Sequence, residues 1–510
     1  MFALAAVSGP LPKVGVIVVA ALVAGVLVAS EQRTRALATL GALVLAPVLL
    51  LVEIWNSPQL ATVHRHPLYA AIGAAVAVAA LFALARLIAP RPRLIGPLAV
   101  LALPFRIPIQ AGPSTSNLLV PLYLVVAVGA LAWIVPVLRD GRAHTPRPDG
   151  SGGWATRVER LLALTVVLYA VQSLYSPDFE KALQQTVFFY VPFALLYRLL
   201  RDLDWNRELV TTCLRLLVVL ALVFAAIAFV EYATKTIILN PKLVVSNDLH
   251  TYFTVNSVFY DPDIFGRFLA LAMVLVTVLL IYDRRQREQL IAVGVLAVLW
   301  AALVLTLSRS SLAALLVGLG VLAALRWRPS RALYIAVAVV LVGAIAVAAT
   351  PRTFGLNQGL NGVSSGRGGL VTGGVSLFGQ RPVWGYGSAS FVTEYRRRHR
   401  GTATTLSASH TIPVTVAAEQ GVIGAVVYLA LVICALVCVL RHARGDPLRG
   451  AIGAAFAALI FHTMLYAAFL EDPITWALLG IGVALAVALP GGTLPLSPDL
   501  RRSRQARPVA

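Results

Sequence analysis

The sequence predicts an all-α polytopic membrane protein, and three observations support this prediction. Of the 510 residues, 59% are hydrophobic and only 13% are charged, whereas soluble globular proteins carry about 25% charged residues. Apolar runs recur along the chain that approach or exceed the roughly 20 residues one membrane span needs. The basic residues, which give a formal net charge of +20, gather mostly between these runs. Because topology explains such an excess of Arg, no nucleic-acid partner is expected.

The apolar runs predict about 14 transmembrane helices. A shorter run, 94–105, contains Pro97 and Pro104 and either crosses as a broken helix or re-enters the membrane. The predicted spans are 14–30, 36–53, 68–88, 118–138, 160–174, 182–200, 209–231, 264–282, 289–307, 310–326, 332–349, 411–440, 450–470 and 473–490.

The basic connecting segments predict the orientation, because cytoplasmic loops of membrane proteins carry excess Lys and Arg. Successive loops then lie on opposite sides of the membrane, provided that 94–105 crosses it. The cytoplasmic segments are 31–35, 86–93, 139–160, 283–288, 325–331, 441–449 and the C-terminal tail. The outer segments are then 54–67, 106–117, 175–181, 232–263, 350–410 and 471–472.

This topology divides the chain into six segments. They are an N-terminal transmembrane bundle (1–140), a cytoplasmic linker (141–159), a transmembrane core (160–349), a large extracytoplasmic loop (350–410), C-terminal transmembrane helices (411–490) and a basic cytoplasmic tail (491–510).

The large outer loop departs from the charge pattern, since its only acid is Glu394 and its arginines are Arg352, Arg367, Arg381, Arg396, Arg397, Arg398 and Arg400. It is either a solvated basic loop or a surface that collects anionic substrate or lipid head groups. Its many glycines, among them Gly385 and Gly387, permit tight turns and a close approach of the backbone to a ligand.

Two outer stretches place an arginine beside a span. Arg309 in "TLSRSSLAALL" either snorkels to head groups or binds a phosphate through two parallel guanidinium hydrogen bonds. Arg267 in "FYDPDIFGRFLALAMVL" either pairs with Asp263, four residues away on the same helix face, or acts in function, because an ionisable group inside a span is costly.

A third stretch, "SASHTIPVTVAAEQGVIG", places His410 before a helix that Pro413 is expected to begin. Helix N-termini favour anions, and a His side chain can accept a proton from a hydroxyl. Glu419 is expected either to support this site or only to pack. His462 and Tyr466, four residues apart, are predicted to form a buried hydrogen-bonding pair.

In order and spacing, these stretches resemble the O-antigen ligase and O-antigen polymerase superfamily. The resemblance covers about residues 180–490 and matches the first 140 residues less clearly. The stretches that carry it are "DPDIFGRFLAL", "TLSRSSLAALLVGL", "SGRGGL" and "RPVWGYGSASF" in the outer loop, "SASHTIPVTVAAEQGVIG", and "EDPITWALLGIG" in the closing span.

The resemblance implies a C-type, all-helical glycosyltransferase (GT-C-like) that inverts at the sugar carbon and needs neither metal nor cofactor. Its donor is a glycan on undecaprenyl diphosphate at the outer face of the bacterial plasma membrane, where it also contacts membrane lipids. The acceptor is a glycan, lipid or protein, so ligase and polymerase both remain open.

The resemblance also assigns roles to residues. It implies that His410 is catalytic and that Arg309, Arg267 and Arg367 bind the diphosphate. The residues expected to support them are Glu419, Gly385 and Gly387.

Two other classes of function remain open. A polysaccharide flippase or secondary transporter fits the number of spans, but transporters place ionisable groups near the bilayer midplane and often have two related halves. Here the candidates cluster at one face and no halves are visible. A non-catalytic membrane scaffold would not need His410.

Overall fold

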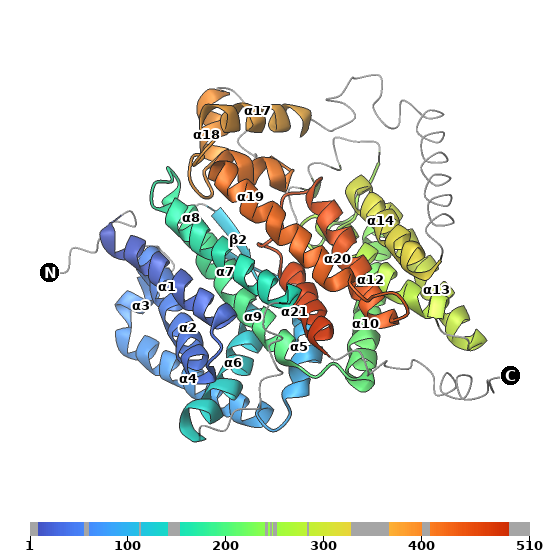
Figure 1. Ribbon diagram of the computed structural model, residues 1–510, viewed down its shortest axis with the longest axis horizontal. Helices are drawn as coiled ribbons and strands as arrows, with labels where there is room; N and C mark the ends of the chain where they lie inside the picture. Colours follow the sequence, from blue (N-terminus) through green and yellow to red (C-terminus); the bar gives the residue numbers. More distant parts are fainter. Residues whose placement is uncertain are drawn as a thin grey trace.

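The computed structural model is built almost entirely of helices (Figure 1). The residues that it describes are 9–55, 61–111, 114–140, 153–239, 243–244, 247, 252–282, 285–327, 367–399 and 409–488.

The first part of the chain forms a group of helices and one hairpin. The elements are α1 (Pro10–Val28), α2 (Gln32–Ile54), α3 (Ala61–Arg65), α4 (Pro67–Ile88), η2 (Pro92–Leu94), α5 (Ile95–Ala102), β1 (Ile107–Ala111), β2 (Ser114–Leu118) and α6 (Val120–Asp140). Strands β1 and β2 pair antiparallel, with Ile107 opposite Leu118. This two-stranded sheet is an addition to the predicted all-α fold.

In the described parts of the middle of the chain, every secondary-structure element is a helix. The elements are α7 (Trp154–Ser173), α8 (Phe179–Gln185), the π-helical turn η3 (Thr186–Tyr190), α9 (Val191–Asp202), α10 (Arg207–Thr234), α12 (Pro262–Tyr282), α13 (Gln286–Leu305) and α14 (Arg309–Arg326). Helix α7 begins inside the segment predicted as a cytoplasmic linker.

Within the residues described, the last part of the chain contributes two short and three longer helices. The elements are α17 (Arg367–Gln380), α18 (Phe391–Arg398), α19 (Ile412–Leu440), α20 (Pro447–Thr463) and α21 (Pro473–Val487). Helices α17 and α18 form within the segment predicted as a large outer loop. Pro413 lies in the first turn of α19, as expected, because proline costs no hydrogen bond there.

The chain is a multi-pass membrane protein. In its described part, nine helices are long and apolar enough to span a membrane, namely α1, α2, α4, α6, α10, α12, α13, α14 and α19. Shorter apolar helices cover Pro92–Ala102, Pro447–Thr463 and Pro473–Val487. The predicted span 332–349 lies outside the described residues, so fourteen spans stay a prediction.

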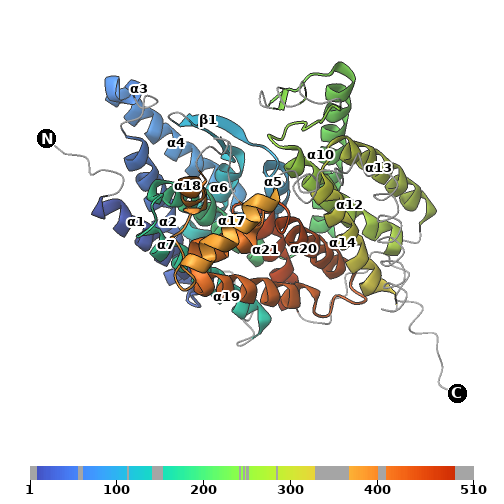
Figure 2. The same cartoon turned by 90° about the horizontal axis from the view of Figure 1, so that it is seen from above.

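Helices α19, α20 and α21 lie between two groups of helices. Figures 1 and 2 show α1, α2, α4, α6 and α7 on one side and α10, α12, α13 and α14 on the other. One cluster of buried apolar side chains runs through all three groups, from Val16 to Leu485. The N-terminal helices therefore share a core with the later helices.

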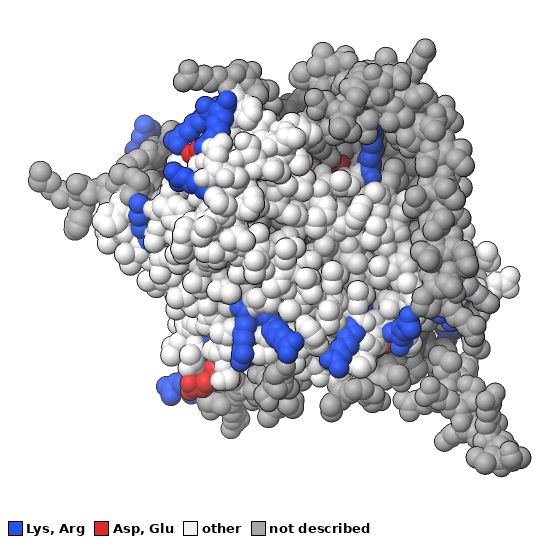
Figure 3. All heavy atoms as spheres, turned by 45° about the horizontal axis from the view of Figure 1, so that its top comes forward, with Lys and Arg blue, Asp and Glu red and all other residues white. Residues whose placement is uncertain are grey.

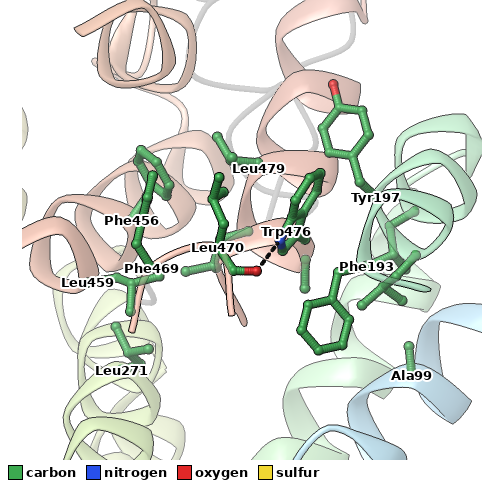
Figure 4. Packing of buried hydrophobic residues seen from close by; sticks show 14 of the residues in the cluster. Ala99, Phe193, Tyr197, Leu271, Phe456, Leu459, Phe469, Leu470, Trp476 and Leu479 are labelled. Atoms are coloured by element: carbon green, nitrogen blue, oxygen red, sulfur yellow. Dashed lines mark hydrogen bonds between the residues drawn. The ribbon is translucent and has the colours of Figure 1, made fainter. Parts of the chain in front are cut away.

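Trp476 of α21 is the largest fully buried side chain in this core. Figure 4 shows it beside Tyr197 of α9, with the ring centroids 6.5 Å apart. Its indole N–H donates to the Leu470 carbonyl at 2.9 Å, which satisfies the one polar group that the ring buries.

Segments predicted to lie on the same side of the membrane contact each other. Thr393 donates to Asp178 at 3.1 Å, and both lie in predicted outer segments. On the other predicted side, Arg449 donates to the Ala488 carbonyl at 2.9 Å. Figure 3 shows Lys and Arg toward the upper part of the molecule and in a row along its lower part, with a broad uncharged zone between them. This separation suits a bilayer around the middle zone.

Candidate functional site

The candidate site begins at the N-terminal end of α12. A carboxylate oxygen of Asp261 accepts the Asp263 N–H at 2.7 Å, and Pro262 opens the helix without needing a hydrogen-bond partner. One turn further on, Arg267 is only 1% exposed. A buried guanidinium at this position requires a counter-charge from another element.

Asp472 supplies that counter-charge from the start of α21. One of its carboxylate oxygens accepts the Ile474 N–H at 3.1 Å and so caps the helix, and the other lies 2.8 Å from Nη2 of Arg267. Both side chains are buried. Arg267 therefore has an ion-pair partner from a helix far away in the sequence.

Tyr466 lies at the centre of the site, in the turn between α20 and α21. Its ring centroid is 5.9 Å from Cζ of Arg267 and 6.3 Å from the His410 ring, and its hydroxyl donates to Asp261 at 3.1 Å. The starts of α12 and α19 therefore meet at one aromatic ring. His410 and Arg267, singled out from the sequence, are brought together in this way.

His462 lies beside Tyr466 and also contacts the serines at the start of α14. Its ring lies 5.6 Å from that of Tyr466, but Nε2 is 3.3 Å from the hydroxyls of Ser310 and Ser311, and the Tyr466 hydroxyl bonds to Asp261. The predicted pair is present through the backbone, where the Tyr466 N–H donates to the His462 carbonyl at 2.9 Å.

The serines of "SRSS" join α14 to α12. Ser308 caps α14 by accepting the Ser311 N–H at 3.3 Å, and Ser310 donates to Asp263 at 3.1 Å. Ser308 also donates to Asp263. Arg309, between these buried serines, is exposed at the first position of α14, where a charged head remains accessible to solvent or to a ligand.

His410 is held by its neighbours immediately before α19. Its φ is +59°, a left-handed conformation that is uncommon for a residue other than glycine. Ser409 accepts the Thr411 N–H at 3.1 Å and lies 2.6 Å from the Thr415 hydroxyl. A conformation of this kind persists only where surrounding contacts fix it, and such conformations cluster at functional sites.

The electrostatics add a residue that sequence reasoning did not find. Burial lowers the pKa of Arg106, while Asp472 opposes this shift and Arg267 adds to it. Arg106 therefore lies in the field of the buried ion pair as a second guanidinium. The only sequence signal was that it is the one charged residue in the predicted outer segment 106–117.

Two acidic groups of the site also have raised pKa values. Burial raises the pKa of Asp261, and the nearby Asp263 carboxylate raises it further. Burial likewise raises the pKa of Tyr466. The Tyr466 hydroxyl therefore stays protonated at neutral pH and serves as a hydrogen-bond donor.

Glu419 fixes the outer segment to α19. Its carboxylate accepts the N–H groups of Ala389 and Phe391 at 2.9 and 3.0 Å, which are at the start of α18. A carboxylate is favourable at a helix N-terminus. No contact joins Glu419 to Tyr466 within the described structure, so its support for the site would act through the outer segment.

Gly385 and Gly387 have φ values of +68° and +99°. A Cβ on Gly385 would lie 2.3 Å from the Glu419 carbonyl oxygen, and one on Gly387 would lie 2.6 Å from Cα of Ser176. The close approach that these glycines permit is therefore to the protein backbone. Gly421, with φ +66°, breaks α19 where this segment docks.

Arg367 begins α17, and its side chain lies outside the described part of the structure. The structure therefore places its backbone but gives no contact to the Tyr466 site.

The family comparison identifies the region that holds these motifs. Residues 294–429 match the family model described as O-antigen ligase. The chain carries an O-antigen ligase domain. This confirms the superfamily that the motifs resembled, and no curated protein matches the chain.

The O-antigen ligase domain provides only part of the site. It includes His410, Arg309 and the serines of α14, whereas Arg267, Asp472 and Tyr466 lie outside the matched range. The O-antigen ligase family implies a glycosyltransferase-like activity on lipid-linked glycans.

Proposed function

We propose that this protein transfers a glycan from an undecaprenyl-diphosphate carrier to an acceptor hydroxyl at the outer face of the bacterial plasma membrane. The transfer inverts the configuration at the sugar carbon and uses no metal. One observation carries the proposal: Tyr466 joins His410, from the O-antigen ligase domain, to the buried pair of Arg267 and Asp472.

His410 is proposed as the general base. The acceptor oxygen attacks C1 of the donor sugar while its proton passes to the imidazole. The bond between C1 and the diphosphate oxygen breaks, and its electron pair stays on the diphosphate. General-base assistance of this kind contributes about 10²–10⁴ in rate.

The arginines are proposed to stabilise the departing diphosphate. Nε and Nη1 of Arg267 have no hydrogen-bond partner among the described residues, and buried donors of this kind need an explanation. Phosphate oxygens would supply one. Because Arg267 is 1% exposed, the diphosphate reaches it only after covering side chains move. Arg309 is exposed, so it would contact the diphosphate first, and Arg367 is proposed to assist from α17.

A reconstituted assay tests the proposal. Purified protein in liposomes receives a fluorescent glycan on undecaprenyl diphosphate and an acceptor glycan, with a chelator and without nucleotide. We expect release of undecaprenyl diphosphate and a labelled product of inverted configuration. His410→Ala should slow release by about 10²–10⁴, whereas His399→Ala, which alters a histidine stacked on Tyr395, should have little effect.

The same assay separates the other functions. Movement of the lipid across the bilayer without bond cleavage would identify a flippase. Unchanged release in His410→Ala would refute the catalytic assignment. Absence of both cleavage and movement with a panel of lipid-linked glycans would favour a scaffold.

A further inference from the structure

A surface hollow of about 510 Å³ lies where the outer segment meets the end of α7. We call its lining the aromatic patch: Tyr175, Arg381, Pro382, Val383, Trp384 and Gly385. The side chain of Trp384 is 60% exposed and that of Val383 is 50% exposed. The Tyr175 hydroxyl donates to the Trp384 carbonyl at 2.7 Å, so the patch is a fixed part of the surface.

The aromatic patch continues two apolar stripes on neighbouring helices. On α7, the exposed positions Leu164 and Val171 lead toward Tyr175, which lies two residues beyond the end of the helix. On α19, the exposed positions are Val422, Val426, Leu429 and Ile433, spaced to share one face. Helices α7 and α19 pack against each other, so the two stripes lie on neighbouring helices.

The lengths of these stripes match a bilayer. From Arg157 to Ser173, the last residue of α7, a rise of about 1.5 Å per residue gives about 24 Å. From Val422 to Arg441 it gives about 29 Å. The hydrocarbon core of a bilayer is about 30 Å thick. The arginines therefore mark one boundary of the hydrocarbon, and the aromatic patch marks the opposite boundary, where Trp and Tyr are enriched in membrane proteins.

The patch also carries positive charge. Arg381 is exposed, with Cζ 4.6 Å from the Tyr386 ring centroid, and Arg398 lies over the same ring at 4.8 Å. Figure 3 shows basic side chains gathered on this part of the molecule. In the segment 381–399, the only acid is Glu394. Exposed arginines at a membrane surface attract anionic lipids.

We propose that the aromatic patch is a binding site for an anionic phospholipid, with Arg381 contacting its phosphate and Trp384 and Val383 seated at the top of its acyl chains. A glycan fits the patch less well, because Pro382, Val383 and Trp384 offer the hollow few hydrogen-bond partners for sugar hydroxyls. The proposal does not depend on glycosyl transfer.

A local fluorescence measurement tests this site. Bimane is attached to Val383→Cys in a chain whose three native cysteines are replaced by alanine. The protein is reconstituted in phosphatidylcholine vesicles that contain a trace of headgroup-nitroxide phosphatidylglycerol or phosphatidylcholine. We expect quenching by the anionic lipid at about five-fold lower concentration than by the neutral lipid, since one arginine near a membrane contributes about that factor.

Two variants and two reference labels complete the test. Arg381→Gln should abolish the preference, and Arg444→Gln, an exposed arginine at the other end of the molecule, should leave it intact. Bimane at Val426→Cys should be quenched by acyl-chain nitroxides, and at Arg397→Cys by aqueous quenchers.

Three outcomes would overturn the proposal. The first is a label at Val383 that only water-soluble quenchers reach, and neither lipid nitroxide does. The second is equal quenching by both lipids. The third is a preference unchanged in Arg381→Gln. A Val383 label that responds to soluble oligosaccharide and to neither lipid would instead identify a glycan site.

Discussion

Nη2 of Arg267 lies 2.8 Å from a carboxylate oxygen of Asp472, and both side chains are almost completely buried. This ion pair joins α12 to the start of α21, far apart in sequence. It also fixes the guanidinium beside Tyr466, whose ring is in turn close to His410.

Removing one partner of this ion pair should strongly destabilise the folded protein. Asp472→Asn keeps an oxygen for the Ile474 N–H but leaves Arg267 buried without a counter-charge. We expect a loss of about 3–5 kcal/mol, measured by unfolding in detergent micelles. Arg397→Gln, at a pair whose arginine is 61% exposed, should cost less than about 1 kcal/mol. Equal losses in the two variants would contradict this account of the pair.

Arg309 should matter for turnover more than for folding. The side chain is exposed, so Arg309→Gln should leave the unfolding midpoint nearly unchanged. If Arg309 stabilises the departing diphosphate, transfer in liposomes should fall by about 10²–10³. Arg326→Gln, at the other end of α14, is the matched control. Wild-type turnover by Arg309→Gln would exclude a role in catalysis.

Removing the Glu419 carboxylate should release the start of α18. Glu419→Ala leaves the Ala389 and Phe391 N–H groups without their acceptor, at a cost of about 1–3 kcal/mol. Hydrogen exchange of these two amides should speed up by about five-fold to 100-fold. Glu180→Ala, at an exposed glutamate, is the comparison. Unaltered exchange at both amides would show that other contacts hold the segment.

Gly421 should tolerate no side chain. Its φ is +66°, and a Cβ would lie 2.2 Å from the Val383 carbonyl oxygen. Gly421→Ala should therefore lower stability by more than about 1 kcal/mol and raise the rate of proteolysis within 381–399. Gly294→Ala, where a Cβ meets nothing within 4 Å, should stabilise its helix by up to about 1 kcal/mol. A stable Gly421→Ala variant would disprove the tight docking.

Asp261 should make stability depend on pH. Its pKa is raised above the ordinary value of 3.8, so the folded protein keeps this proton to higher pH than the unfolded chain does. The contribution of Asp261 to stability therefore falls as pH rises from about 4 through the raised pKa. In Asp261→Asn this part of the pH dependence should disappear.

Tyr466→Phe provides a second test of the same carboxyl. The Tyr466 hydroxyl donates to Asp261 and lowers its pKa, so losing the hydroxyl should extend the fall in stability to higher pH. Unfolding midpoints between about pH 4 and pH 8 measure both effects. Identical profiles for wild type and Asp261→Asn would rule out this titration.

The helices were predictable because their signals are local. Every predicted span within the described residues coincides with helix over much of its length, and the shorter apolar run 94–105 contains the short α5. Local signals failed where the chain turns. Helix α20 ends at Thr463, before the predicted 470, and the residues after it place Tyr466 beside His410.

The sequence by itself determined that this chain is a multi-pass helical membrane protein and that His410 and Arg267 are candidates for one site. Hydropathy, proline positions and motif order suffice for this, because each depends on residues close together in the chain. Only the tertiary structure decided that Arg267 pairs with Asp472, that Tyr466 is the common neighbour, and that Arg106 lies close by. These partners come from separate helices, and the packing of the bundle, which no local pattern encodes, brings them together.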